Sequence, residues 1–136
     1  MTIRFAERQT LRIFDVPVGL DAQPLFAAAV TSWDCKVFDL DRPRDAIDTP
    51  VYELLGQDPA GTNADSGLPF FGTALRTGEG WTADSNGFGF VYDLNTALFD
   101  PLGGRGYRIE LTYSTAAHGE RTTILKAECI GRQGVV

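Results

Sequence analysis

His118 is the single histidine in the chain, so a Ser–His or Cys–His nucleophile system would have to use it. Gly119 follows it directly, and the two residues lie between two runs in which polar and apolar residues alternate. This position is typical of a hairpin turn, where the side chain is solvated. The sequence also lacks the Gly-x-Ser-x-Gly motif of a nucleophile elbow. We therefore interpret His118 as a turn residue.

Acidic residues cluster in residues 39–48, DLDRPRDAID, with carboxylates at Asp39, Asp41, Asp45 and Asp48. Oxygen-rich loops of this kind can bind calcium. The spacing differs from that of an EF-hand, and Arg42 and Arg44 stand between the carboxylates. We therefore expect internal ion pairs in this segment and no metal site.

Paired carboxylates are the other source of catalysis to consider, because a glycosidase needs two of them across one cleft. Glu53, Glu110 and Glu128 fall at outward-facing positions of expected strands, and nothing in the sequence brings two together. The sequence therefore predicts that the protein is not an enzyme. The enzyme alternative requires a pocket that holds His118 or two close carboxylates.

The glycine-rich run at residues 103–106, GGRG, does not have the features of a phosphate-binding loop. It lacks the Gly-Lys-Ser/Thr ending, and no long helix follows to supply a dipole. We interpret the run as a corner of the chain and expect no cofactor.

The two cysteines, Cys35 and Cys129, lie far apart in the chain and in no Cys-x-x-Cys or Cys/His motif. A zinc site is therefore not expected. Both fall in strand-like runs, where a thiol behaves as a small hydrophobic side chain. We interpret them as buried thiols of a protein made in a reducing cytoplasm; a disulfide between neighbouring strands is the alternative.

Composition and charge exclude several classes of partner. The formal net charge of −6 disfavours binding to nucleic acid, because an acidic chain repels the phosphate backbone. The longest apolar stretch, residues 25–30, is too short to span a bilayer. The first ten residues, MTIRFAERQT, lack the apolar core of a secretory signal. We expect neither a nucleic-acid nor a membrane partner.

Short alternating runs separated by glycine and proline indicate an all-β protein. Expected strands cover residues 10–16, 32–40, 50–55, 68–75, 88–92, 107–113 and 121–130. Residues 24–30 and 93–99 favour helical turns, Asn86-Gly87 is a hairpin signal, and residues 57–67 form the longest loop. We predict one immunoglobulin-like antiparallel sandwich of about seven or eight strands over residues 1–136, with residues 131–136 a short tail.

The segment from residue 81 to residue 113 resembles small immunoglobulin-like proteins of bacteriophages and prophages. These carry a W-x-x-D-S-x-G stretch before a strand, then a glycine corner and a Y-R-x-E strand. The matching residues here are Trp81, Asp84, Ser85, Gly87, Gly104, Tyr107, Arg108 and Glu110. The resemblance implies a capsid decoration, tail or baseplate protein in which Tyr107 bonds across the corner before its strand. The first half departs from the pattern, and Cys35 follows Trp33 too closely for the Cys–Trp–Cys arrangement of antibody domains.

Aromatic residues provide the candidate interaction surface. Phe70 and Phe71 are adjacent, so at least one should point away from the core of its own sheet and need a cover. With Trp81 they are the candidate interface residues for contacts with other virion proteins or with a second copy of the chain. The alternative is a carbohydrate-binding module, in which Trp81 and a phenylalanine lie exposed together and stack on sugar rings.

Overall fold

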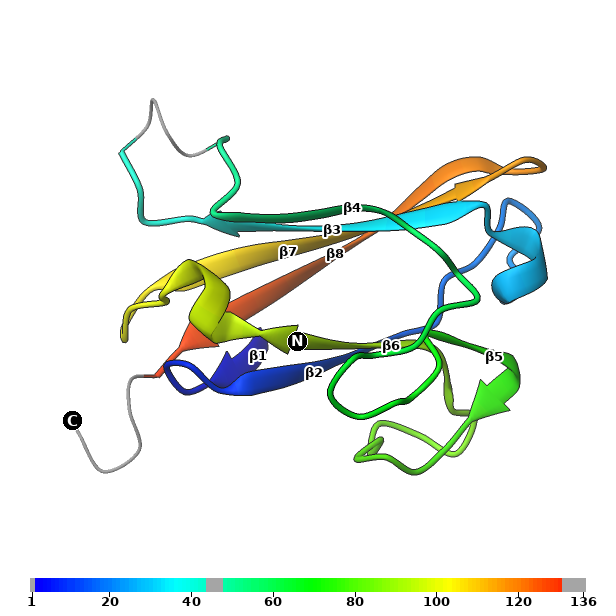
Figure 1. The fold of residues 1–136 in the computed structure, drawn as a ribbon, viewed down its shortest axis with the longest axis horizontal. Helices are drawn as coiled ribbons and strands as arrows, with labels where there is room; N and C mark the ends of the chain where they lie inside the picture. The colour runs from blue at the N-terminus through cyan, green and yellow to red at the C-terminus, as the bar shows by residue number, and fades with distance from the viewer. Residues whose placement is uncertain (1, 44–47, 131–136) are drawn as a thin grey trace.

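The computed structural model describes residues 2–43 and 48–130. These residues contain eight strands and two short 3-10 turns, connected by loops (Figure 1). The strands are β1 Thr2–Phe5, β2 Thr10–Asp15, β3 Ser32–Asp39, β4 Tyr52–Gln57, β5 Phe71–Arg76, β6 Phe88–Asn95, β7 Gly106–Thr115 and β8 Gly119–Cys129. The turns are η1 Ala27–Ala29 and η2 Thr96–Phe99, within the two segments expected to be helical. The all-β prediction is confirmed.

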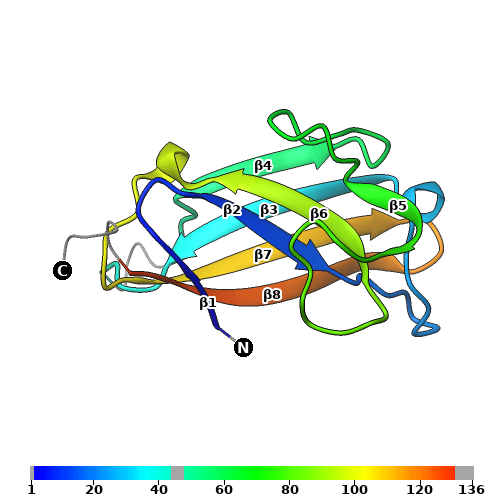
Figure 2. The same cartoon turned by 90° about the horizontal axis from the view of Figure 1, so that it is seen from below.

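The strands form two sheets that face each other (Figure 2). The larger sheet has the order β1-β8-β7-β3-β4, and the smaller has the order β2-β6-β5. β1 pairs parallel with β8, and all other neighbours are antiparallel. In immunoglobulin-like sandwiches, strands B, E and D share one sheet, and C, F and G share the other, with C′ added in the variable type. The observed order follows this arrangement, and the predicted sandwich is confirmed.

The centre of the core forms from alternate residues of β3 and β7. Trp33, Cys35 and Val37 of β3 are all fully buried. The Trp33 ring meets Phe70, Phe90 and Tyr92 edge-on, at centroid distances of 4.7, 5.0 and 5.2 Å. Edge-to-face contacts of this kind add to the free energy of apolar burial. This aromatic cluster joins the two sheets at their centre.

The corner before β7 has the hydrogen bond that a tyrosine corner requires. The Tyr107 hydroxyl accepts a bond from Leu102 N–H at 3.1 Å. Gly104, with φ of 83°, lies between them, a conformation that side chains other than glycine rarely adopt. Its N–H donates to Cys129 O at 2.7 Å, so the corner is also attached to the end of β8.

The connection between β5 and β6 differs from the sequence prediction. Asn86-Gly87 does not close a two-residue hairpin, because residues 77–87 join the strands as one long loop. The Asp84 carboxylate accepts bonds from both Asn86 N–H and Gly87 N–H, so the turn is stabilised within the loop. Gly87 then passes so close to Arg76 that no side chain fits.

The cysteines are buried thiols and not a disulfide, as we interpreted them. Cys35 lies on β3 and Cys129 on β8, and β7 separates these strands. The disulfide alternative required neighbouring strands and is therefore wrong. The expected tail at residues 131–136 lies outside the described residues.

Candidate interaction surface

His118 lies in the β7–β8 turn and has a structural role. Its Nδ1 accepts a hydrogen bond from Leu20 N–H at 3.0 Å, and its own N–H donates to the Thr115 hydroxyl at 2.8 Å. Gly19 packs directly against the imidazole, since a Cβ there would lie 2.8 Å from Cε1 and Nε2. The side chain therefore joins the loop after β2 to the β7–β8 turn. The prediction of a turn residue is confirmed, but the side chain is half-buried and bonded rather than fully solvated.

Asp39 and Asp41 form an ion pair and a hydrogen bond, but not with the predicted partners. Asp39 accepts a bond of 2.6 Å from Arg105, and Asp41 accepts one of 2.7 Å from Gly106 N–H. Their partner segment is the glycine corner before β7, which folding brings beside the end of β3. Asp45 and Arg44 lie outside the described residues, and the described part of the chain holds no group of three metal-ligating side chains.

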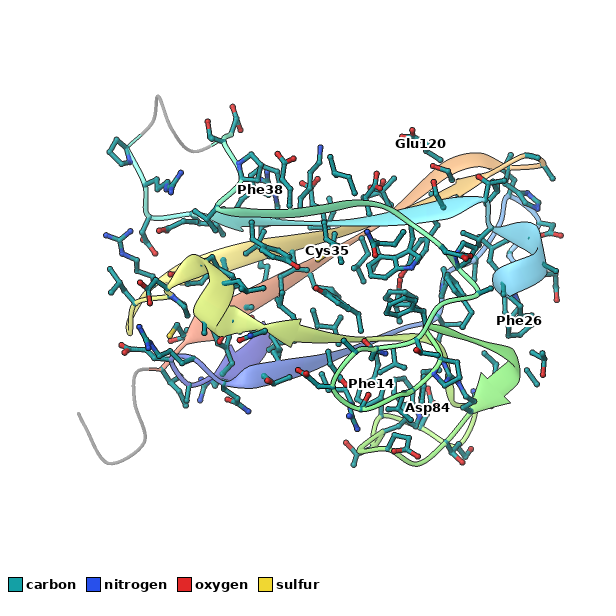
Figure 3. All side chains as sticks on the ribbon, viewed as in Figure 1. Phe14, Phe26, Cys35, Phe38, Asp84 and Glu120 are labelled. Atoms are coloured by element: carbon teal, nitrogen blue, oxygen red, sulfur yellow. The ribbon has the colours of Figure 1, made fainter. Side chains whose placement is uncertain are left out.

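The glutamates considered for acid–base chemistry lie on the outer face of the larger sheet. Glu110 pairs with Arg108 at 2.8 Å, and Glu128 pairs with Arg4 at 3.9 Å. In Figure 3, Phe38 and Glu120 mark this outer side, whereas Cys35 points between the sheets. Phe38 is covered by the Arg108 guanidinium, 4.4 Å from its ring centre. The Glu128 pair joins β8 to β1, whereas the Glu110 pair lies along β7, and both pairs lie on the outer face of the sheet.

Phe70 and Phe71 both point into the core, so the expectation that one needs an outside partner is wrong. Their exposed fractions are 8% and 5%. Alternation does not apply, because Phe70 precedes the first residue of β5 and its N–H bonds to Gly61 O. Its ring packs on Trp33, and that of Phe71 packs on Phe90 at 5.1 Å.

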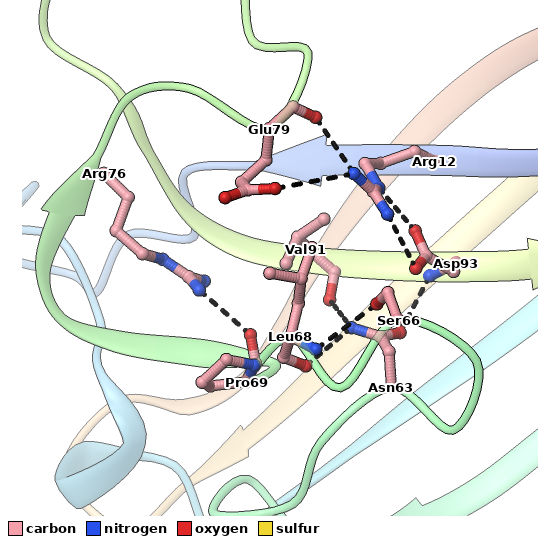
Figure 4. Close-up of polar contacts among 9 residues, drawn as sticks. All are labelled: Arg12, Asn63, Ser66, Leu68, Pro69, Arg76, Glu79, Val91 and Asp93. Atoms are coloured by element: carbon pink, nitrogen blue, oxygen red, sulfur yellow. Dashed lines mark hydrogen bonds and ion pairs between the residues drawn. The ribbon is translucent and has the colours of Figure 1, made fainter.

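A polar cluster on the outer side of the smaller sheet holds two loops in place (Figure 4). Arg12 of β2 binds Asp93 of β6 with two bonds, of 2.7 and 3.1 Å, and donates to Glu79 O at 3.2 Å in the loop at residues 77–87. Buried Asn63 donates to Leu68 O and to a β6 carbonyl, and its Oδ1 accepts a bond from Asp93 N–H. Asn63 therefore fixes the loop at residues 57–67, the longest loop expected from the sequence.

The charge of Asp93 is stabilised within this cluster. Burial alone would raise the pKa of its carboxyl, but hydrogen bonds from Arg12 and Ser66 and the positive charge of Arg12 outweigh burial and lower it. A carboxylate that is ionised and held by two hydrogen bonds is a poor general acid or base at neutral pH. A hollow of about 270 Å³ between β4 and β6 is lined in part by Asp93. The ionised, hydrogen-bonded Asp93 therefore gives no support to interpreting that hollow as an active site.

Trp81 lies at the edge of the sandwich in a partly apolar groove. The ring is half-buried and packs on Phe14 and Phe88, with centroid distances of 5.5 and 5.8 Å. Its Nε1 donates to Asp84 O at 2.9 Å, which fixes the ring orientation. The groove has a volume of about 370 Å³ and is lined by Ile3, Arg12, Phe14, Gly80, Trp81, Thr82, Ala83, Ile124 and Leu125. Of the three predicted interface residues, Phe70 and Phe71 are buried, and only Trp81 is partly exposed.

An open strand edge borders the same groove. β1 pairs with β8 only at residues 126–129, whereas β8 begins at Gly119. Within the described chain, residues 119–125 of β8 therefore pair on one side only, with β7. Ile124 on this edge is 59% exposed. The backbone edge and the groove form one continuous candidate surface, and Ile3 and Ile124, which the sequence analysis missed, belong to it.

Comparison of the chain with family models, curated proteins and solved structures finds no match. Across residues 2–43 and 48–130, no helix has the length and apolar character needed to cross a bilayer.

Proposed function

We propose that this protein is a non-enzymatic structural protein of a virus particle, a phage capsid decoration, tail or baseplate component that stabilises an assembly through subunit contacts. The observation that carries the proposal is the open edge of β8 beside the Trp81 groove. An edge of this kind offers unpaired N–H and C=O groups to another chain. The protein acts in the virion and is assembled in the host cytoplasm.

Three further features support this function. Of the residues considered for catalysis or metal binding, His118, Asp39 and Glu110 are engaged in structural contacts. The resemblance of residues 81–113 to phage immunoglobulin-like proteins supplies the virion setting. The net charge of −6 favours a protein partner over a nucleic acid.

The test is whether the purified chain forms oligomers or binds a particle. Sedimentation velocity over a range of concentrations should show association, and co-sedimentation with phage capsids or tails should carry the protein into the pellet. A chain that stays monomeric and binds none of these particles would contradict the proposal.

Trp81 and Phe14 lining one groove favour glycan binding as a second candidate function. A sugar ring stacks on an aromatic face and takes hydrogen bonds from a charged neighbour such as Arg12. Glycan-array binding should be lost in Trp81→Ala and largely kept in Trp81→Phe, which retains an aromatic face. Absence of binding by the wild-type chain, or equal binding by the alanine variant, would remove this candidate.

A further inference from the structure

The open edge of β8 has the length and charge pattern needed to pair with itself. We propose that two copies of this chain join through antiparallel pairing of residues 119–125 around a two-fold axis at Thr122. The two larger sheets then form one continuous sheet across the dimer. This inference rests on the proposed assembly function and names its partner as a second copy.

The part of β8 that β1 leaves unpaired has one residue at its centre. β1 occupies the edge of β8 from Lys126 onward, so the accessible stretch runs from residue 119 to residue 125. Thr122 is its middle residue. A two-fold interface requires a surface that is complementary to itself, and an antiparallel strand pair centred on one residue meets this requirement. Pairing shifted toward the C-terminus would collide with β1 of the partner.

The register places no like charges opposite each other. With Thr122 opposite Thr122, Arg121 faces Thr123 and Glu120 faces Ile124. Like charges directly opposite are destabilising, whereas threonine pairs bond across strands. The Thr122 hydroxyl already lies 3.2 Å from the Thr112 hydroxyl within one copy. In the dimer, Thr112 and Thr122 of the two copies therefore form one row across the joined larger sheets. The exposed Ile124 is covered by the aliphatic part of Glu120 from the other copy.

The charge of residues 119–125, which form the seam between the two copies, favours a second copy as the partner. Each chain carries a net charge of −6, so two copies repel over most of their surfaces. Residues 119–125 hold one acidic and one basic side chain, Glu120 and Arg121, and their charges cancel. Two acidic chains can therefore meet at this edge without local repulsion.

Three of the other edge strands, β4, β5 and β1, carry features that oppose pairing, whereas β2 pairs with β6 without a register break. β4 has a register break opposite Trp33, and Gly56 on it has a φ of 63° with its N–H bonded to Asp34. β5 has a register break between Phe71 and Arg76. β1 is only four residues long. Bulges and short strands are the usual protection of edges, and the stretch at residues 119–125 has neither.

A charge-swap experiment tests the register itself. In Ile124→Glu, each new carboxylate faces Glu120 of the other copy. Because two opposed pairs become repulsive, we expect the dissociation constant of the dimer to rise about tenfold or more. In Ile124→Lys, the ammonium faces the same Glu120 and the dimer should persist. Adding Glu120→Lys to Ile124→Glu should restore it. Leu98→Glu, at an equally exposed leucine outside the seam, is the control.

A cross-link tests the two-fold axis. Thr122→Cys places two thiols directly opposite each other, close enough for a disulfide between copies. Under oxidation it should give a covalent dimer, whereas Thr112→Cys, on the same face of β7, should not. Cys35 and Cys129 are fully buried and do not interfere. Circular dichroism and thermal melting confirm that each variant folds.

The outcomes separate the interface from the function. A wild-type dimer that tolerates Ile124→Glu and fails to cross-link at Thr122 overturns this interface but leaves assembly intact. A monomeric wild type that still binds particles also overturns this interface. If the backbone amides of residues 119–125 are then protected from hydrogen exchange only when the protein is bound to the particle, the edge pairs with a different protein. A monomer that binds no particle contradicts both proposals.

Discussion

Two partly buried carboxylates in this sandwich, Asp15 and Asp93, have pKa values shifted in opposite directions. Asp15, facing inward from β2, accepts a bond of 2.6 Å from the Tyr113 hydroxyl on the opposite sheet. Burial raises the pKa of its carboxyl, although bonds from Tyr113, Thr123 and Val16 N–H lower it in part. Asp93, paired with Arg12, has a lowered pKa. The two groups therefore affect stability in different pH ranges.

Asp15 should make the protein less stable as the pH rises through its folded-state pKa. The folded state binds this proton more tightly than the unfolded chain, whose pKa is near 3.8, so stability is greatest below that value and falls above it. In Asp15→Asn this dependence should disappear, and stability at pH 7 should stay within about 1 kcal/mol of wild type because the amide oxygen still accepts from Tyr113. Urea unfolding over a pH series measures the stability of wild type and of Asp15→Asn. If the two stabilities change with pH in the same way, Asp15 is not the source of this pH dependence.

The Arg12–Asp93 pair should stabilise the fold at neutral pH and lose its effect in acid. The folded-state pKa of Asp93 is lowered, so its contribution is present above the unfolded value and declines as the pH falls through the folded one. Asp93→Asn should cost about 1–3 kcal/mol at pH 7, since it weakens a charged hydrogen bond to a carboxylate that is only 5% exposed.

The exposed pair Arg8–Asp100 supplies the control for Asp93. Its side chains are 61% and 77% exposed, and solvent screens such pairs. Asp100→Asn should therefore change stability by less than about 0.5 kcal/mol. Equal losses in the two variants, measured by chemical unfolding, would show that burial of Asp93 does not strengthen its pair.

At the level of elements, the β5–β6 connection shows how a loop is held on a sheet. Residues 77–87 leave β5, lie over Phe14 through Trp81, and return to β6 past Arg76. The Arg76 guanidinium donates to Pro69 O and lies 4.7 Å above the Phe88 ring. Loop, strand end and ring therefore pack as one unit that also forms a wall of the Trp81 groove.

Gly87 and Gly78 form a matched pair for testing this packing. Both have positive φ values, 97° and 94°, but a Cβ on Gly87 would collide with the Arg76 backbone, whereas Gly78 has open space. Gly78→Ala should cost about 1 kcal/mol from backbone strain, and Gly87→Ala at least about 1 kcal/mol more from the collision. Denaturant midpoints measure both. Equal costs would mean that the loop moves away freely.

The elements themselves were predicted to different extents. β3, β7 and β8 follow from alternation, and their inner faces are those expected, whereas β2 follows from its β-forming residues alone. β1 was not predicted, because four residues carry too little pattern and its strand character depends on parallel pairing with β8. The Asn-Gly signal was a true turn inside a longer loop, since the Asp84 bonds stabilise it independently of the strands.

At the scale of the whole molecule, one aromatic core joins two sheets of unequal width. The five-stranded sheet extends beyond the three-stranded one, so its edge residues Leu125 and Ile3 are only partly covered. This difference in width produces the groove and leaves the β8 edge accessible. The candidate surface is therefore a property of the sandwich and not of any one segment.

The buried thiols should report on opening of the whole molecule. Cys35 and Cys129 are fully buried, and burial raises the pKa of the Cys35 thiol to about 12. Because thiolates are the reactive form, a thiol reagent should modify the native protein roughly a thousandfold or more slowly than the unfolded chain in urea. Absorbance assays of thiol release measure both rates. Rapid reaction of one thiol in the native state would show local opening at β3 or β8.

The sequence by itself determined what depends on neighbours along the chain: alternating inner faces, turns and the corner at Tyr107. Of the candidate surface it identified only Trp81, whose residue type marks it, and it assigned Phe70 and Phe71 wrongly. Tertiary structure decided the Asp39–Arg105 pair, the place of β1 and the open edge at residues 119–125. The physical reason is that a two-residue period is local, whereas the strand that covers an edge or ring is set by packing between segments distant in sequence.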